Sequence, residues 1–300
     1  MSRTVVLIGA GGQLGRDLTA VWAARRPADR LVGLTHGDVE VADAGSVAAA
    51  LEPLRPAVVI NTAAYHKVDA VEADAPNAFA VNAVGARNVA RACQALGAVC
   101  VFLSTDYVFS GAGRRRPHAE TDPIDPLNVY GVSKAAGEML VRLDCDRHLV
   151  VRSSGLYGLA GASGKGGNFV ETMLRLGRSG GPVRVVDDQV LTPTPTAALA
   201  EQLAELVDTE RFGTYHATCQ GECSWFQFAG EIFRQAGLDV DLSPQTTAES
   251  GAAARRPPYS VLDNAGLRAL AIDRLPDWRE GLAGYLAARR AFDAEAARPA

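Results

Sequence analysis

The sequence of 300 residues has little excess charge and no long apolar run, and each shortage excludes a class of protein. A formal net charge of −4 gives no general attraction for nucleic acid or for an anionic membrane surface. No apolar run reaches the roughly 18 residues that a membrane-spanning helix needs. A strand-like run begins at Thr4, without the layout of a signal peptide. We therefore expect a cytoplasmic protein without nucleic-acid or membrane partners.

Cysteine is also scarce. The five cysteines are scattered and odd in number, which is typical of reduced thiols in a cytosol. Cys219 and Cys223 lie close in sequence, but no second pair or histidine cluster accompanies them, so we expect no metal site. The one basic run, residues 114–116, is expected to be a solvated loop, and contact with a substrate diphosphate is the alternative.

A glycine-rich motif follows the first apolar run. Thr4–Ile8 is predicted to be a buried parallel strand, and Gly9, Gly12 and Gly15 precede an apolar helical pattern. In such motifs the first glycine allows a tight turn, the second lets backbone N–H groups approach a pyrophosphate, and the third lets the helix pack on the strand. The helix N-terminus adds a partial positive charge. The motif predicts a dinucleotide site, and a glycine turn without a ligand is the alternative.

Strand-like and helix-like runs alternate through the first half of the chain. Further strands are predicted at 31–34, 57–61, 99–103 and 149–152, and helices at 47–54, 78–96 and 130–143. This order is typical of an α/β fold with a Rossmann-type doubly wound parallel sheet, whose ligands lie beyond the C-terminal strand ends. We expect residues 1–154 to form the dinucleotide-binding domain.

The composition changes after Tyr157. A run of glycines predicts a loop that can act as a lid over a site: Gly158, Gly161, Gly164, Gly166 and Gly167. Helices are predicted at 168–178, from the turn at Pro193 and Pro195 to residue 207, and at 277–290, and a strand is predicted at 183–186. A further helix is predicted at 224–236, where Ser224 and Gln227 form a capping box. We expect residues 155–300 to form mainly a smaller substrate-binding lobe, with parts near 180–210 returning to the main sheet.

Tyr130 and Lys134 stand at positions i and i+4, which share one face of a helix. A free phenol has a pKa of about 10. A neighbouring ammonium is expected to lower that pKa toward the value that suits a proton donor. The hydroxyl of Thr105, after a predicted strand, could hold a substrate carbonyl beside the phenol. A Tyr-x-x-x-Lys pattern alone is a weak signal, and it gains weight from its place after the glycine-rich motif.

Together these motifs resemble the dTDP-4-dehydrorhamnose reductase family of the extended short-chain dehydrogenase/reductase superfamily. The matching segments run nearly end to end and lie at 12–15, 61–65, 104–109, 128–134, 167–169, 188–189, 193–194, 224–225 and 256–257. The string Ser-Thr-Asp-Tyr-Val-Phe at 104–109 is the most specific. In the related sugar-nucleotide dehydratases a glutamate follows the Thr-Asp pair. Tyr107 stands there in this chain, which argues against a dehydratase.

The resemblance implies that Tyr130 donates the proton, that Lys134 lowers its pKa and holds the nicotinamide ribose, and that Thr105 contacts the sugar. It also implies substrate contacts at Asp106, Gly155, Asn168 and Arg256. The implied contacts of NADPH or NADH are, besides Tyr130 and Lys134, Gly9, Gly12, Gln13, Leu14, Gly15, Thr35, Glu40, Val41, Ala63, Ala64, Tyr65 and Leu103.

Some of these residues could have a structural role instead of a role in binding or catalysis. Glu40 could be an ordinary exposed loop acid, and Asn82 either supports the inner sheet or only ties loops together. His36 and His66 are expected to be solvated or hydrogen bonded, since this chemistry needs no imidazole. The second strand is followed by Thr35, which can bind either cofactor, so we expect both to work with a modest preference for NADPH.

Two positions depart from the family's pattern. Gly155 stands where the family usually has an aromatic residue, often tryptophan. Val190 and Leu191 follow the Asp-Gln pair at 188–189, where a glycine is common. Unless Leu156, Tyr157 or a side chain of the glycine-rich loop fills the space, we expect a wide pocket that accepts more than one keto-sugar.

The function that the resemblance implies is NAD(P)H-dependent reduction of the 4-keto group of dTDP-4-dehydro-L-rhamnose to dTDP-L-rhamnose, by a monomer or homodimer. One alternative is the reduction of another nucleotide-linked keto-sugar. A second is a non-catalytic regulatory subunit resembling the β subunit of methionine adenosyltransferase. The presence of Thr105, Tyr130 and Lys134 together disfavours that second alternative.

Overall fold

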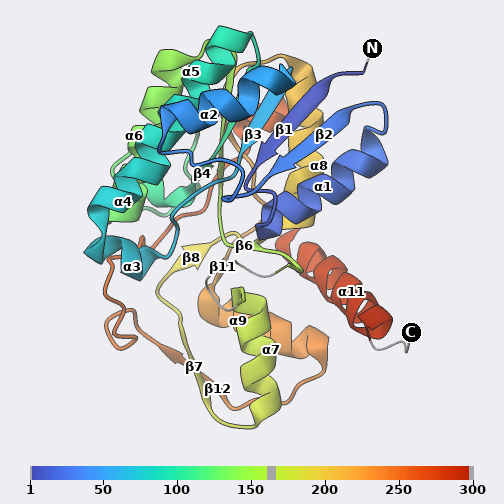
Figure 1. Ribbon diagram of the computed structural model, residues 1–300. Coiled ribbons are helices and arrows are strands. Elements are labelled where there is room, and N and C mark those ends of the chain that lie inside the picture. The colour runs from blue at the N-terminus through green and yellow to red at the C-terminus, as the bar shows by residue number, and fades with distance from the viewer. Residues whose placement is uncertain (1, 161–166, 297–300) are drawn as a thin grey trace.

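A parallel sheet forms the centre of the larger part of the molecule in the computed structural model, which describes residues 2–160 and 167–296 (Figure 1). The strand order is β10-β5-β4-β3-β1-β2, and every neighbouring pair is parallel. The strands are β1 (Thr4–Ile8), β2 (Arg30–Leu34), β3 (Val58–Asn61), β4 (Val99–Thr105), β5 (His148–Ser153) and β10 (Gly213–His216). The predicted Rossmann-type fold is confirmed, with β10 as an edge strand that the sequence patterns did not predict.

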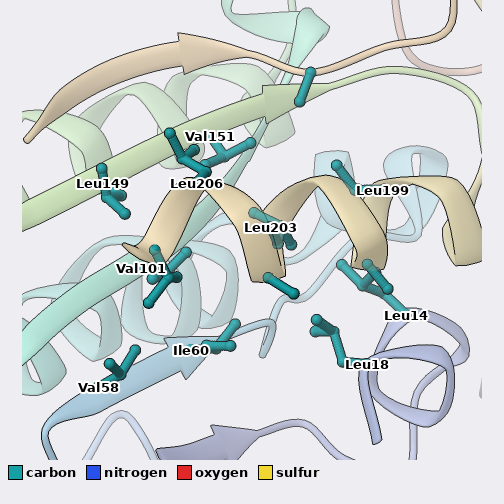
Figure 2. Close-up of a cluster of buried hydrophobic side chains, with 14 of the residues drawn as sticks. Leu14, Leu18, Val58, Ile60, Val101, Leu149, Val151, Leu199, Leu203 and Leu206 are labelled. Atoms are coloured by element: carbon teal, nitrogen blue, oxygen red, sulfur yellow. The ribbon is translucent and has the colours of Figure 1, made fainter. Parts of the chain in front are cut away.

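Both faces of the central strands are buried, because β1, β3, β4 and β5 send alternate side chains into two different cores. In β1, Val5 and Leu7 enter one core, whereas Val6 and Ile8 enter the other. The first core is covered by α1 (Gln13–Arg25) and α8 (Thr196–Leu206), and Figure 2 shows their leucines against the sheet. The second core is covered by α2 (Ala44–Leu51), α5 (Ala86–Leu96) and α6 (Val129–Asp144).

The long helix predicted at 78–96 is not uniform. It consists of α4 (Ala75–Phe79), the π-helical turn η2 (Ala80–Gly85) and then α5. Isolated π turns inside helices are frequent at functional sites. Asn82 lies in this turn and is completely buried. The interruption thus sets a polar side chain in the second core, where hydrophobic spacing alone predicted only an apolar helix.

A smaller lobe lies below the sheet in the view of Figure 1. Its core packs α7 (Phe169–Ser179), α9 (Trp225–Ala236) and α11 (Trp278–Ala296), with β7 (Val183–Val186) paired to β12 (Leu242–Gln245). The predicted capping box of α9 is confirmed: the Ser224 hydroxyl accepts a hydrogen bond from the Gln227 backbone N–H, and the Gln227 side chain accepts one from Ser224 N. The chain returns to the main sheet through α8 and β10, whereas β7 stays in the lobe.

Two short strand pairs connect the lobe to the sheet. They are β6 (Leu156–Tyr157) with β9 (Thr194–Pro195), and β8 (Val190–Leu191) with β11 (Cys223–Ser224). The remaining short elements are η1 (Glu52–Leu54), α3 (Val68–Ala73), η3 (Asp106–Val108), η4 (Val207–Thr209) and α10 (Ala265–Ala269). Of the predicted lid, Gly161, Gly164 and Gly166 lie outside the described residues. Within the described ranges, none of the helices combines the length and the apolar character that crossing a membrane requires.

Candidate active site

One cavity of about 1440 Å³ lies at the C-terminal ends of the sheet strands and reaches the smaller lobe. Every residue that the sequence predicts as a cofactor or substrate contact lines this cavity. They come from the loops after β1, β2, β3, β4 and β5, from α6 and from the lobe. The fold therefore brings the predicted site residues together, although their individual roles stay predictions.

The glycine-rich loop forms a cradle at one end of the cavity. Gly9 has a φ of +88°, which favours glycine, and its N–H donates a hydrogen bond to Leu34 O. A Cβ on Gly15 would lie 2.3 Å from Gly9 O, so a larger residue would push the helix away from the turn. Helix α1 begins at Gln13 without a side-chain cap, and its first backbone N–H groups have no side-chain partner.

The side chain of Gln13 adds to the cradle. Its Nε2 donates to Leu156 O at 3.4 Å, whereas its buried Oε1 has no hydrogen-bond partner. Space is also open above Gly11, where a Cβ would meet nothing within 4 Å. Uncapped N–H groups, the positive end of a helix and an open backbone surface suit the pyrophosphate of a dinucleotide.

The loop after β2 places the Asp38 carboxylate next to Thr35. Thr35 donates two hydrogen bonds to Asp38 Oδ2, from its N–H at 2.8 Å and from its hydroxyl at 2.7 Å. These bonds lower the pKa of Asp38, so the group is ionised at neutral pH. Glu40 Oε1 accepts a hydrogen bond from Ala42 N at 2.9 Å while the residue lines the cavity. His36 lies 3.7 Å from the other oxygen of Glu40.

The predicted catalytic residues meet where β4 ends and α6 begins. Asn128 caps α6 by accepting a hydrogen bond from Gly131 N at 2.7 Å, which fixes the first turn that carries Tyr130. Thr105 and Tyr130 both line the cavity, and the Thr105 side chain acts on the Tyr130 phenol. Lys134 follows one turn later and is 2% exposed, with its Nζ 4.0 Å from the centroid of the Phe102 ring.

The expected lowering of the Tyr130 pKa is wrong in this structure. Burial raises the pKa of Tyr130 to about 12, the negative charge of Asp106 adds to the rise, and hydrogen bonding with Thr105 opposes it. Burial also lowers the pKa of Lys134 to about 7, and the nearby Glu138 carboxylate opposes that change. Because Lys134 is only partly charged at neutral pH, it cannot lower the pKa of the phenol as a full ammonium would.

A buried ion pair stands behind Lys134. The Arg152 guanidinium donates to both oxygens of Glu138, at 2.8 and 2.7 Å, and the Ser104 hydroxyl donates to Glu138 Oε1 at 2.6 Å. Both Glu138 and Arg152 are almost completely buried. The sequence reasoning missed this pair, and the signal for it was a glutamate one further turn along the face of α6 that carries Tyr130 and Lys134.

Asp106 is held by three hydroxyl groups. Ser154 and Ser260 donate to its Oδ2 at 2.8 and 2.6 Å, and Thr105 donates to its Oδ1 at 3.0 Å. Burial raises the pKa of Asp106 above its usual range, and these hydrogen bonds limit the rise. The carboxyl group therefore ties the ends of β4 and β5 to a distant segment of the chain, and it fixes the Thr105 hydroxyl. Its predicted contact with a sugar stays a prediction.

Asn82 ties the loop after β3 to helix α6, and not two loops to each other as one of its two interpretations expected. Its Oδ1 accepts from Tyr65 N, and its Nδ2 donates to Tyr65 O, both at 2.9 Å. The Nδ2 also donates to Ser133 Oγ at 3.0 Å. These bonds attach the loop after β3 to the helix that carries Tyr130 and Lys134.

The other predicted substrate contacts have partners of their own. Asn168 caps α7 by accepting from Glu171 N at 3.0 Å, and its Nδ2 donates to Gly158 O at 2.8 Å. Arg256 Nη2 donates to Asp69 Oδ2 at 2.7 Å, and the residue also lines the cavity. The basic run at 114–116 does not line the cavity. Arg114 and Arg116 pair with Asp122 in their own loop, which favours the loop interpretation over a diphosphate contact.

The space directly beside Gly155 is not open as expected, whereas the range of keto-sugars that the protein accepts stays a prediction. Gly155 has a φ of +57°, and a Cβ there would lie 2.8 Å from Leu191 Cδ1. Leu191 therefore occupies this place, and not Leu156, Tyr157 or the glycine-rich loop. The two departures from the family's pattern are neighbours in space, which the sequence alone gave no means of seeing.

Three other cavity residues were also missed. Phe169 and Trp225 form an aromatic pair with ring centroids 4.6 Å apart, on the side of the smaller lobe. Lys67 follows the loop that Asn82 holds, and it lines the cavity as well. The chain has only three lysines against 27 arginines. This scarcity, together with the position of Lys67 two residues after the matching segment at 61–65, was the signal that could have found it.

The chain matches known proteins over nearly its full length. A family model described as the RmlD substrate binding domain matches residues 3–291. A dTDP-4-dehydrorhamnose reductase of Streptomyces griseus is 42% identical over 284 residues, which cover 92% of this chain and 91% of the relative. A dTDP-4-keto-6-deoxy-D-glucose reductase of Streptomyces niveus is 37% identical over 280 residues, covering 92% and 94%.

A solved structure is also similar to this chain over nearly its full length. The crystal structure of dTDP-4-dehydrorhamnose reductase from Bacillus anthracis strain Ames in complex with NADP superimposes with a TM-score of 0.90 at 39% sequence identity. The similarity covers 96% of this chain and 99% of that one.

Proposed function

This chain belongs to the family described as the RmlD substrate binding domain, and we propose that it reduces the 4-keto group of dTDP-4-dehydro-L-rhamnose to give dTDP-L-rhamnose. The observation that carries the proposal is the position of Thr105, Tyr130 and Lys134 in the same cavity as the glycine-rich cradle. A hydride donor and a proton donor must both reach one carbonyl carbon and its oxygen. A single cavity that holds both groups of residues meets this requirement.

The cofactor is NADPH or NADH, and it supplies the hydride when bound. The cradle fits such a group, because its N–H groups, the buried and unpaired Gln13 Oε1 and the close packing at Gly15 leave a polar concave surface. Gly9, Gly12, Gln13, Leu14 and Gly15 would hold the pyrophosphate, and Thr35, Glu40 and Val41 the adenosine. Ala63, Ala64, Tyr65 and Leu103 would line the path toward Tyr130.

In the reaction, Tyr130 and Thr105 orient the substrate and Tyr130 moves the proton. The Tyr130 hydroxyl donates a hydrogen bond to the carbonyl oxygen of the sugar. The Thr105 hydroxyl, which donates to Asp106 without substrate, turns to donate a second one, and the two bonds polarise the C=O bond. As that oxygen gains negative charge, the O–H bond of Tyr130 breaks and the proton passes to it. The protonated form of Lys134 stabilises the phenolate that remains and binds the ribose of the cofactor.

The proposal includes a cytoplasmic location and a monomer or homodimer. All five cysteines are free and buried, which suits a reducing compartment. Sedimentation of the purified protein would give the oligomeric state.

The test is reduction of a panel of nucleotide-linked 4-keto sugars by the purified protein, with cofactor oxidation and product identity as readouts. The panel includes dTDP-4-dehydro-L-rhamnose and dTDP-4-keto-6-deoxy-D-glucose, because a relative named as a reductase of the second sugar is 37% identical. We expect the first to be reduced to dTDP-L-rhamnose with the highest kcat/KM. A preference for another keto-sugar would support the alternative substrate. Cofactor binding without any reduction would favour a regulatory role.

A further inference from the structure

The side chain of Leu191 forms part of the cavity wall at the place where Gly155 has no side chain. A Cβ on Gly155 would lie 2.8 Å from Leu191 Cδ1 and 3.0 Å from the Cα of Pro193. Leu191 is only 4% exposed, and both Gly155 and Leu191 line the cavity. At this place the cavity wall consists of Gly155, which has no side chain, and of the small part of Leu191 that stays exposed beside it.

This part of the wall lies close to the reacting groups. Ser153 is the partner of Thr105 in the pairing of β5 with β4, and Gly155 follows two residues after Ser153. Leu191 is fixed on the other side by the pairing of β8 with β11, where it stands opposite Cys223. A paired strand on one side and a close-packed glycine on the other leave the leucine little freedom to move.

A second apolar surface comes from the same pair of strands. Trp225 follows β11 directly and packs against Phe169, and both line the cavity. The cavity thus has an aromatic surface and an aliphatic surface on the lobe side of Thr105. An aliphatic surface offers no hydrogen bond to a sugar hydroxyl, whereas it packs well against a methyl group.

We propose that Leu191 is a specificity-determining residue that selects 6-deoxyhexoses by packing against their methyl group. The inference rests on the proposed function, since the ligand is a nucleotide-linked hexose. A hydroxymethyl group at the same place would lose hydrogen bonds to water without replacing them at Leu191. An apolar pocket of this kind discriminates against an added hydroxyl by up to about a hundredfold.

The experiment is a calorimetric titration that needs no turnover. The ligands are dTDP-6-deoxy-D-glucose and dTDP-D-glucose, which differ by one hydroxyl group, and dTDP alone. They are titrated into wild type, Leu191→Ala and the volume-conserving control Leu191→Met, each saturated with NADPH. The NADPH dissociation constant and the thermal unfolding of each variant are measured first, to show that the fold and the cofactor site are intact.

Wild type and Leu191→Met should bind dTDP-6-deoxy-D-glucose at least about tenfold more tightly than dTDP-D-glucose, which sets the expected ratio of the two affinities. In Leu191→Ala this ratio should fall to about twofold, with the affinity for dTDP and for NADPH unchanged within about twofold. An unchanged ratio in Leu191→Ala would overturn the proposal. So would equal loss of affinity for dTDP and both sugars, or weaker NADPH binding, because Leu191 would then face the nucleotide or the cofactor.

The two proposals fail in different ways. If wild type binds these ligands with the expected ratio but reduces no 4-keto sugar, only the proposed function is contradicted. If wild type reduces dTDP-4-dehydro-L-rhamnose but Leu191→Ala keeps the wild-type ratio of affinities for the two sugar ligands, only the assignment of Leu191 is contradicted. If wild type binds no dTDP-linked hexose, both are wrong.

Discussion

Tyr130 and Lys134 lie one turn apart on α6, and burial moves their pKa values in opposite directions, to about 12 for the phenol and about 7 for the amine. The phenol is therefore protonated across the whole working range, which a proton donor needs. The amine titrates within that range. It lies over the Phe102 ring and near Glu138, which Arg152 and Ser104 hold.

The pH dependence of kcat/KM follows from this pair. Lys134 is protonated below pH 7 and loses its charge above it, and the proposed mechanism needs the charged form. We expect kcat/KM, which reports the pKa values of the free enzyme, to be level below about pH 7 and to fall by up to about tenfold per unit above it. In Lys134→Met the activity should be low and this fall should disappear. A fall above pH 7 that persists in Lys134→Met would exclude Lys134 as its cause.

Asn82 should matter more to stability than an asparagine with a single side-chain bond. Asn82→Ala removes two hydrogen bonds to Tyr65 and one to Ser133, and it leaves buried groups unpaired. We expect a loss of about 1–3 kcal/mol in the free energy of unfolding, measured with urea. The control is Asn88→Ala, which removes one bond to Val41 O and should cost less. Equal losses would show that Asn82 does not hold the loop after β3 against α6.

Gly155 allows the steric effect of Leu191 to be separated from backbone strain. Gly155 and Gly180 both have positive φ, +57° and +71°, but a Cβ on Gly180 would meet nothing within 4 Å. Gly180→Ala should cost about 1–2 kcal/mol of stability from the left-handed backbone alone. Gly155→Ala should cost about 1–3 kcal/mol more because of overpacking against Leu191. Urea unfolding measures both, and equal costs would contradict the contact.

The Asp38 carboxylate should reduce the use of NADPH relative to NADH. It accepts both Thr35 hydrogen bonds beside the end of β2, where the ribose 2′ position of a bound cofactor lies in this fold. Asp38→Asn keeps an oxygen for Thr35 but removes the charge that repels a 2′-phosphate. We expect the ratio of kcat/KM for NADPH to that for NADH to rise by roughly three- to tenfold. The exposed Asp239→Asn is the control, and the same ratio in both variants would count against this role.

Local sequence predicted the parts of the molecule that depend on neighbours in the chain. The first strand, the glycine turn and the capping box of α9 each lie within a few residues, and the structure has them as predicted. The shared helix face of Tyr130 and Lys134 also follows from spacing alone. Their pKa values do not, because burial and the charge on Glu138 depend on packing between α6, β4 and β5.

Long-range contacts explain the other errors. Gly155 and Leu191 both differ from the family's pattern, but only the pairing of β6 with β9 and of β8 with β11 brings them together. Likewise, the π turn that carries Asn82 is stabilised by Tyr65 and Ser133, which lie far from it in sequence. Hydrophobic periodicity contains no information about such partners.

The most direct test of the central claim, that Tyr130 donates the proton in the reduction of a nucleotide-linked 4-keto sugar, compares wild type with Tyr130→Phe. Cofactor oxidation is followed with NADPH and dTDP-4-dehydro-L-rhamnose, and the NADPH dissociation constant of each protein is measured separately. We predict that kcat falls by about two to four orders of magnitude in Tyr130→Phe, while NADPH binding stays within about threefold of wild type. A Tyr130→Phe variant that turns over at nearly the wild-type rate would contradict the account.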